Sequence, residues 1–141
     1  EVAFVLKRDL AEPGITAIDV LRATDYVVPC FEIVESRIDN WDIKVLDTVA
    51  DNASCGVFVV GAEPKDPLEI DLSLVGMTIE VRKPGDTVGE LFATGAGAAV
   101  KGSPVNSVVW LANTLAALGT PCREPAEPPR ASSSSAFARA R

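Results

Sequence analysis

The stretch Tyr26-Val-Val-Pro-Cys-Phe-Glu-Ile-Val34 decides the fold prediction, because it places a single carboxylate, Glu32, inside an apolar run. Its β-branched and aromatic residues predict a strand over residues 27–37, with Pro29 tolerated near the beginning. Side chains alternate along a strand, so one face carries Cys30, Glu32, Val34 and Ser36. An unpaired carboxylate is costly to bury. Glu32 therefore calls for a partner or an exposed position.

A bound cation is one such partner. Glu1 is a second carboxylate that opens a strand-like run over residues 1–6. Two carboxylates on separate strands can converge on a hard cation such as Mg²⁺, which prefers oxygen ligands. The alternative for Glu32 is pairing with Arg37 or solvation at a sheet edge, which is the commoner fate of such a residue.

Composition excludes several classes of function. The chain has 141 residues, 48% of them hydrophobic and 23% charged, which suits one globular domain with a core. Its net charge of -7 argues against a nucleic-acid partner, since that affinity depends on clustered Lys and Arg. The sequence contains no His, so Ser-His-Asp catalysis and imidazole zinc sites are excluded.

The cysteines and hydropathy indicate the compartment. Cys30, Cys55 and Cys122 are odd in number and widely spaced, which suggests reduced thiols rather than a disulfide framework. No apolar run is long enough to span a bilayer, and no basic segment with an apolar core begins the chain. We therefore expect a cytoplasmic protein with no membrane partner.

The rest of residues 1–119 alternates short strands and helices. Thr16 and Asp19 form a variant capping box for a helix that ends near Thr24. Ser103, Pro104 and Gly119 predict the beginning and end of a packing helix over residues 103–118. The other predicted elements are strand 2–6, a helical turn at 47–53, a buried strand at 56–60, a loop at 61–67, and a hairpin of strands 77–82 and 90–94.

Residues 120–141 differ in character from the rest. They contain four prolines and the run Ser132 to Ser135, and Phe137 is their only large apolar residue. Such a segment buries too little surface to offset its ordering entropy, so we predict that it is disordered. Its Pro, Ala, Arg and Ser bias also fits the hypothesis of a shifted reading frame.

Several motifs together carry a family resemblance that covers nearly all of residues 1–119. The matching segments are residues 1–10, 28–34, 36–38, Trp41, 47–54 and 103–112. In these segments the chain resembles the group of 2-hydroxypenta-2,4-dienoate hydratases and 4-oxalocrotonate decarboxylases within the fumarylacetoacetate hydrolase superfamily. The resemblance implies an α+β fold with a mixed, rolled β-sheet and a few covering helices, here incomplete at both ends. Pattern alone gives one domain of mixed α and β structure.

The resemblance also implies a site. In that family three acidic residues hold Mg²⁺ or Mn²⁺: a Glu-x-Glu pair and a later Glu. Glu1 matches the second member of the pair and Glu32 the later Glu, while the first member would lie two residues before Glu1. The segment Asp51-Asn-Ala-Ser54 borders the substrate, so Asn52 and Ser54 are expected substrate contacts, and Lys44 either neutralises substrate charge or is a surface residue. The catalytic acid/base residues of the family lie upstream of this chain.

The implied activity is metal-dependent addition of water to 2-hydroxypenta-2,4-dienoate, giving 4-hydroxy-2-oxopentanoate in the meta-cleavage route of aromatic catabolism. The closest rival is decarboxylation of 4-oxalocrotonate (2-oxo-3-hexenedioate). A rival of another class is a non-catalytic fragment or oligomer partner. The expected partners are a small 2-oxo or 2-hydroxy-dienoic acid and further copies of the chain, or a decarboxylase or hydratase paralogue.

Overall fold

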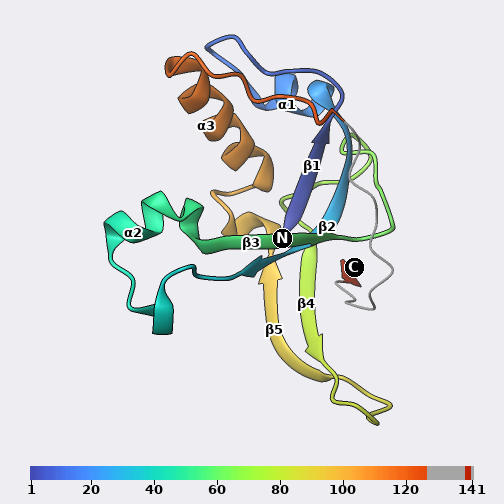
Figure 1. Cartoon of the computed structure of the whole chain (residues 1–141). Coiled ribbons are helices and arrows are strands. Elements are labelled where there is room, and N and C mark those ends of the chain that lie inside the picture. Colours follow the sequence, from blue (N-terminus) through green and yellow to red (C-terminus); the bar gives the residue numbers. More distant parts are fainter. Residues whose placement is uncertain (127–138, 141) are drawn as a thin grey trace.

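The computed structural model describes residues 1–126 and 139–140 of the chain (Figure 1). This part contains three α-helices, three short 3₁₀ helices and two small sheets. Its elements are β1 (Val2–Leu6), α1 (Ala17–Ala23), β2 (Thr24–Val34), η1 (Asp39–Trp41), α2 (Val45–Ala50), η2 (Asn52–Ser54), β3 (Cys55–Val60), β4 (Gly76–Val81), β5 (Glu90–Ala96), η3 (Gly97–Ala99), α3 (Pro104–Ala117) and β6 (Arg139–Ala140). None of the helices in these residues is long and apolar enough to cross a membrane.

Strand β2 connects the two halves of the first sheet. It has 11 residues, and the sheet order is β1-β2-β3. Its first half pairs with β1, where Val2 lies opposite Pro29, and its second half pairs with β3, where Glu32 lies opposite Phe58. The second sheet has the order β5-β4-β6, and every strand pairing in the described part of the chain is antiparallel. The α+β prediction is thereby confirmed, with small antiparallel sheets.

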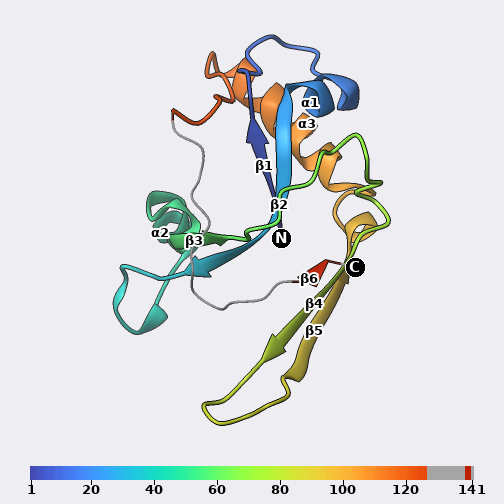
Figure 2. The same cartoon turned by 90° about the vertical axis from the view of Figure 1, so that its right-hand side faces the viewer.

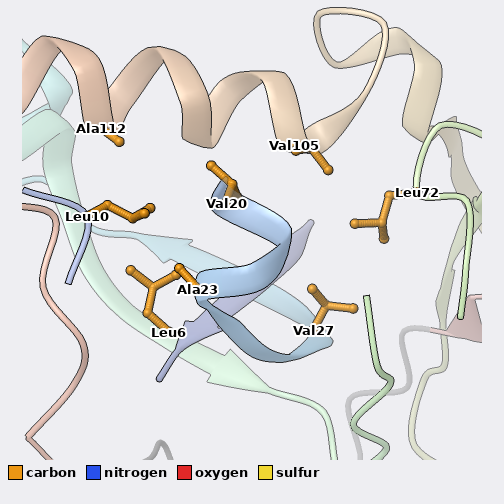
Figure 3. Close-up of a cluster of buried hydrophobic side chains, with 8 residues drawn as sticks. All are labelled: Leu6, Leu10, Val20, Ala23, Val27, Leu72, Val105 and Ala112. Carbon is orange, nitrogen blue, oxygen red and sulfur yellow. The ribbon is translucent and has the colours of Figure 1, made fainter. Parts of the chain in front are cut away.

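The main core lies where α1 and α3 pack over β1 and the first half of β2 (Figure 3). Val20 points from α1 toward α3, between the α3 residues Val105 and Ala112 in this view. The buried members of the cluster are Leu6, Leu10, Val20, Ala23, Val27, Leu72, Val105 and Ala112. The β4–β5 hairpin extends away from these helices (Figure 2). The core therefore fixes β2 from one end and leaves its second half outside the helical layer.

Substitution of Val20 tests this core. Its side chain is 0% exposed, so Val20→Ala should lower the free energy of unfolding by about 2 kcal/mol through lost burial and a residual cavity. The matched control is Val49→Ala in α2, where the side chain is 74% exposed and the change should stay within about 0.5 kcal/mol. Urea unfolding measures both, and equal effects would show that the core is misplaced.

Local sequence signals set most element boundaries correctly. The Thr16 backbone N–H donates to the Asp19 carboxylate and the Asp19 N–H donates to the Thr16 hydroxyl, which confirms the capping box before α1. Pro104 is the first residue of α3, and Gly119 follows its end with φ of 71°. Strand β1 and the β4–β5 hairpin also lie where they were predicted. Strand β2 begins and ends three residues earlier than predicted.

The prediction of a buried strand at residues 56–60 is wrong in its burial. Strand β3 forms there, but Phe58 is 64% exposed, Val57 is exposed, and only Val60 is buried. The physical reason is the position of β3 at the edge of its sheet, beside the half of β2 that lies beyond α1 and α3 (Figure 1). An apolar run predicts a strand but not which layer covers it.

The boundary after residue 119 stays a prediction. Residues 127–138 and 141, which carry most of the segment expected to be disordered, lie outside the described residues. At residues 122–124 the structure has hydrogen-bonded backbone instead. Cys122 and Leu10 exchange backbone hydrogen bonds of 3.0 and 2.8 Å, and the Glu124 N–H donates to the Asp9 carboxylate at 2.8 Å. Pairing with the loop after β1 orders this part, which composition alone does not reveal.

Candidate functional site

Glu1 and Glu32 project from the same face of the first sheet. The amino group of Glu1 donates to the Cys30 carbonyl at 2.9 Å, and the Cys30 N–H donates to the Glu1 carbonyl at 3.0 Å. Glu1 therefore extends β1 opposite Cys30, and Glu32 lies two residues further along β2. Side chains two residues apart in a strand, and those directly opposite across a ladder, share a face. Both glutamates are exposed.

Cys30 and Cys55 are neighbours of Glu32, and the pKa of each thiol is affected by the Glu32 carboxylate. Burial raises the pKa of the Cys30 thiol, and the negative charges of Glu1 and Glu32 raise it further against the opposing effect of the amino terminus. Partial burial also raises the pKa of the Cys55 thiol, with a hydrogen bond to Glu32 as the next cause. Cys30 is two residues from Glu32 on β2 and Cys55 lies opposite Val34, so both thiols are near neighbours of Glu32 in the sheet.

The two carboxylates suit a hard divalent cation in chemistry and placement. Mg²⁺ takes oxygen ligands and is commonly held through one or two carboxylates, with water and substrate completing its shell. In residues 1–126 and 139–140, no group of three or more His, Cys, Asp or Glu side chains is arranged to hold a metal ion. A metal site built on Glu1 and Glu32 would therefore hold the ion through two carboxylates.

A left-handed turn follows α2 and leads into β3. The predicted helical turn at 47–53 forms as α2 only as far as Ala50, and then Asn52, Ala53 and Ser54 have φ of 50°, 57° and 58°. Side chains with a Cβ enter this region at a cost of about 1–2 kcal/mol per residue. Backbone held in such conformations is found at ligand clamps and active sites. The turn coincides with the segment expected to meet the substrate.

Arg37 pairs with Asp51 and not with Glu32. The guanidinium lies 3.0 Å from the Asp51 carboxylate, so the alternative of a Glu32–Arg37 pair is wrong. The backbone N–H of Arg37, and then its side chain, lower the pKa of Asp51 from its ordinary value of 3.8. The charged carboxylate of Asp51 therefore stabilises the folded protein at neutral pH, and this contribution is lost as the pH falls through the lowered pKa of Asp51. Glu32 is exposed, and within the described residues β2 pairs there with β3 alone, so the other alternative, solvation at a sheet edge, fits the structure.

Ser54 is the most telling residue of the turn. It is 4% exposed, and its hydroxyl makes no hydrogen bond of good geometry within the described residues, although it lies near enough to the Asp51 carboxylate to contribute to the lowered pKa of that group. Buried hydroxyl groups normally have partners. Cys55, the next residue, lies opposite Val34, so Ser54 is close along the sheet to Glu32. Along β2, Glu1 lies opposite Cys30 and Ser54 lies beside Glu35, so the two positions are five residues, or about 17 Å, apart, with Glu32 between them.

Removal of this hydroxyl should therefore not weaken the unliganded protein. We expect Ser54→Ala to raise the free energy of unfolding by about 1 kcal/mol, because an unpaired buried polar group is removed. The control is Ser36→Ala, which loses the hydrogen bond that the Ser36 hydroxyl accepts from the Ile38 N–H at 3.0 Å and should lower stability by about 1 kcal/mol. Urea unfolding distinguishes the two. A clear loss of stability in Ser54→Ala would mean that the hydroxyl already has a partner.

The other expected contacts lie less close to the carboxylates. Asn52 is exposed in the same turn, so its amide is free to meet a ligand. Lys44 is exposed before α2, where its N–H donates to Asp47, and no described contact connects it to Glu1 or Glu32. Sequence reasoning did not predict that Arg37 contacts Asp51 and Cys55 on either side of the turn, although the segment Ser36-Arg-Ile38 was among the matching motifs.

Comparison with known proteins places this geometry in context. No family model matches the sequence. The chain is 56% identical over 119 residues to a 2-hydroxypent-2,4-dienoate hydratase of Pseudomonas putida, an alignment that covers 84% of this chain and 51% of that protein. It is 54% identical over 121 residues to a 2-hydroxyhexa-2,4-dienoate hydratase of Comamonas testosteroni, with coverages of 86% and 44%. The chain thus spans about half the length of the curated relatives it matches.

Solved structures agree with the sequence relatives. The 4-oxalocrotonate decarboxylase from Pseudomonas putida G7, complexed with magnesium and adipate, superimposes with a TM-score of 0.72 at 39% identity, covering 86% of this chain and 44% of that one. The same decarboxylase complexed with calcium and acetate gives a TM-score of 0.70 at 38% identity, with coverages of 86% and 43%. Both comparisons therefore cover most of this chain and less than half of the neighbour.

Proposed function

We propose that this chain, a relative of the 2-hydroxypentadienoate hydratases and 4-oxalocrotonate decarboxylases, is a hydratase that depends on a divalent metal, or is part of such an enzyme. The reaction is addition of water to 2-hydroxypenta-2,4-dienoate, in its 2-oxopent-4-enoate form, to give 4-hydroxy-2-oxopentanoate. The observation that carries the proposal is the sharing of one sheet region by Glu1, Glu32 and the unpartnered Ser54 hydroxyl, in a chain 56% identical to such a hydratase.

The residues divide the work between them. Glu1 and Glu32 are the carboxylates that would hold Mg²⁺ or Mn²⁺, and the magnesium and calcium complexes of the decarboxylase support a divalent ion. When bound, such an ion supplies a Lewis acid for the carboxylate and 2-oxygen of the substrate, which draws electron density away from carbon 4. The exposed Asn52 amide would bind the substrate carboxylate or oxo group, and the buried Ser54 hydroxyl would donate to the same group once the substrate displaces the side chains that cover it. Lys44, if it contributes, does so through its charge alone.

The turn at Asn52–Ser54 keeps water away from one side of the proposed site. Ser54 is buried although Asn52 is exposed, so a substrate carboxylate that meets both is desolvated on one side only. Hydrogen bonds to a carboxylate are stronger where water is excluded. We therefore propose that the substrate carboxylate lies at the Ser54 side of the turn.

Absorbance tests the proposal directly. With Mg²⁺ present, the dienoate absorbance should fall in the presence of the parent enzyme that contains this chain and its upstream acid/base residues, and it should stay constant after the metal is removed with a chelator. A dienoate absorbance that stays constant under both conditions would refute the hydratase proposal. Restoration of activity by Mn²⁺ as well as Mg²⁺ would show that the site accepts both ions.

Decarboxylation of 4-oxalocrotonate is the second candidate, and the structural match to a 4-oxalocrotonate decarboxylase favours it. The higher identity to the hydratases, 56% against 39%, ranks it below water addition. Release of carbon dioxide from 2-oxo-3-hexenedioate distinguishes the two. Carbon dioxide release without water addition to the dienoate would reverse the ranking.

The same relationship supports two structural proposals. We propose that the two small sheets belong to a mixed, rolled β-sheet like that of the C-terminal domain of fumarylacetoacetate hydrolase, and that the chain works in an oligomer with its own copies or with a paralogue. Large apolar side chains left exposed on α2 and β5 support further packing partners. These are Val45, Leu46, Val49, Leu91 and Phe92.

A further inference from the structure

We propose that Arg37 is a positioning residue, which holds the left-handed turn Asn52–Ser54 in the place where that turn meets the substrate. This inference rests on the proposed function, because it assigns the turn a substrate to meet. It adds a residue that makes no contact with the reacting atoms and acts through the turn.

The guanidinium of Arg37 brackets the turn from both sides. On the near side, Nη1 donates to Asp51 Oδ1 at 3.0 Å and to the Asp51 carbonyl at 3.5 Å. On the far side, Nη2 donates to the carbonyl of Cys55 at 2.9 Å. The backbone N–H of Arg37 adds a bond to Asp51 Oδ2 at 3.1 Å. One side chain thus fixes the residues immediately before and after the turn.

The backbone of β2 completes the attachment. The N–H of Glu35 donates to the Ser54 carbonyl at 2.7 Å, and the N–H of Ser54 donates to the Asp51 carbonyl at 2.9 Å within the turn. The turn is therefore docked on the end of the strand that carries Glu32. A displacement of the turn would change the distance between Ser54 and the carboxylate of Glu32 without any change in either residue.

Asp51 is the more buried partner of the Arg37–Asp51 ion pair. The Asp51 side chain is 8% exposed, whereas that of Arg37 is 58% exposed. Arg37 covers Asp51 from the solvent side and satisfies its carboxylate, while three left-handed residues follow directly. Only a planar fork of several N–H donors reaches a carboxylate and a separate carbonyl together, so Lys cannot replace Arg here.

The test compares Arg37→Met, Arg37→Lys and the matched control Arg22→Met, an exposed arginine in the last turn of α1. For water addition we expect kcat/KM to fall about tenfold to a hundredfold in both Arg37 variants, as for partners that orient metal ligands. Most of the loss should be in KM, because the turn binds substrate and transition state alike. Arg22→Met should match wild type in kinetics and in urea midpoint, whereas Arg37→Met should also lower the urea midpoint, because it leaves the Asp51 carboxylate, whose side chain is 8% exposed, without its guanidinium.

Amide hydrogen exchange provides a readout that is independent of activity. In Arg37→Met the N–H groups of Glu35 and Ser54 should lose protection, while the N–H of Val27, bound to the Lys65 carbonyl at 2.9 Å, should keep it. An unchanged exchange of Glu35 and Ser54, wild-type kinetics in Arg37→Met, or full activity in Arg37→Lys would overturn the proposal. If the wild-type protein itself is inactive, the proposed function fails, and the exchange result alone decides whether Arg37 holds the turn.

Discussion

Glu32→Gln should abolish metal-dependent turnover, lowering kcat/KM by more than about a hundredfold. Residues that only hydrogen-bond to a metal ligand already change metal affinity or activity about 10- to 100-fold. Glu32 is itself a proposed ligand, and Glu1 is the other carboxylate on this face of the described sheet. The variant keeps the shape of the side chain and removes its charge, so the fold should persist. Steady-state kinetics at saturating Mg²⁺ measures the effect.

The control for this substitution is Glu35→Gln, an exposed glutamate three residues further along the chain that alternation places on the opposite face. It should retain wild-type kinetics. Loss of activity in both variants would point to the net charge of the region, and retention in both would remove Glu32 from the site.

The Cys55 thiol gives Glu32→Gln a second readout. The carboxylate of Glu32 contributes to the raised pKa of this thiol, after partial burial. Removal of the charge should therefore lower the pKa toward its ordinary value, so that the thiol reacts faster with a disulfide reagent near neutral pH. The pH dependence of this rate in the metal-free protein, with Cys30 and Cys122 replaced by Ala in both proteins compared, measures the shift. An unchanged pKa would mean that Glu32 does not lie beside Cys55.

Gly97→Ala should prevent stable folding. A Cβ atom at Gly97 would lie 1.8 Å from the carbonyl oxygen of Leu72, a backbone atom that cannot move aside without displacing a buried core residue. Overpacking in cores costs about 1–3 kcal/mol and occasionally more. Because the clash is with backbone, we expect the upper end of this range, at least about 3 kcal/mol.

The matched control lies two residues earlier. A Cβ atom at Gly95 would meet nothing within 4 Å, so Gly95→Ala should leave stability within about 1 kcal/mol of wild type. Circular dichroism and urea unfolding compare the two variants. Equal stability in both would show that the loop carrying Leu72 does not pack against η3 as the structure describes.

The sequence predicted best those features that depend on neighbouring residues. The capping box of Thr16 and Asp19 and the beginning of α3 at Pro104 involve groups within one helical turn, so the pattern contains them completely. The close packing of Gly97 against Leu72 is different, because it joins residues 25 positions apart and the local pattern does not contain the partner.

Features that depend on distant residues were not predictable in the same way. The left-handed turn at Asn52–Ser54 is bracketed by contacts with Arg37, which lies 14 residues before Asp51 in the sequence. By itself, a short segment that contains Asp and Asn favours an ordinary helix end. The exposure of Phe58 depends on which layer lies over the second half of β2. The roles of Glu1, Glu32, Asn52, Ser54 and Lys44 remain proposals.

The most direct test of the account is to locate the divalent ion with Mn²⁺, whose unpaired electrons broaden the nuclear resonances of nearby amides. Titration of the ¹⁵N-labelled protein should first broaden the amide signals of Val2, Phe31 to Ile33 and Cys55, and Glu32→Gln should remove this effect. Broadening centred on the exposed acidic residues Asp39 and Asp42, or broadening that persists in Glu32→Gln, would contradict a metal site on this face of β2.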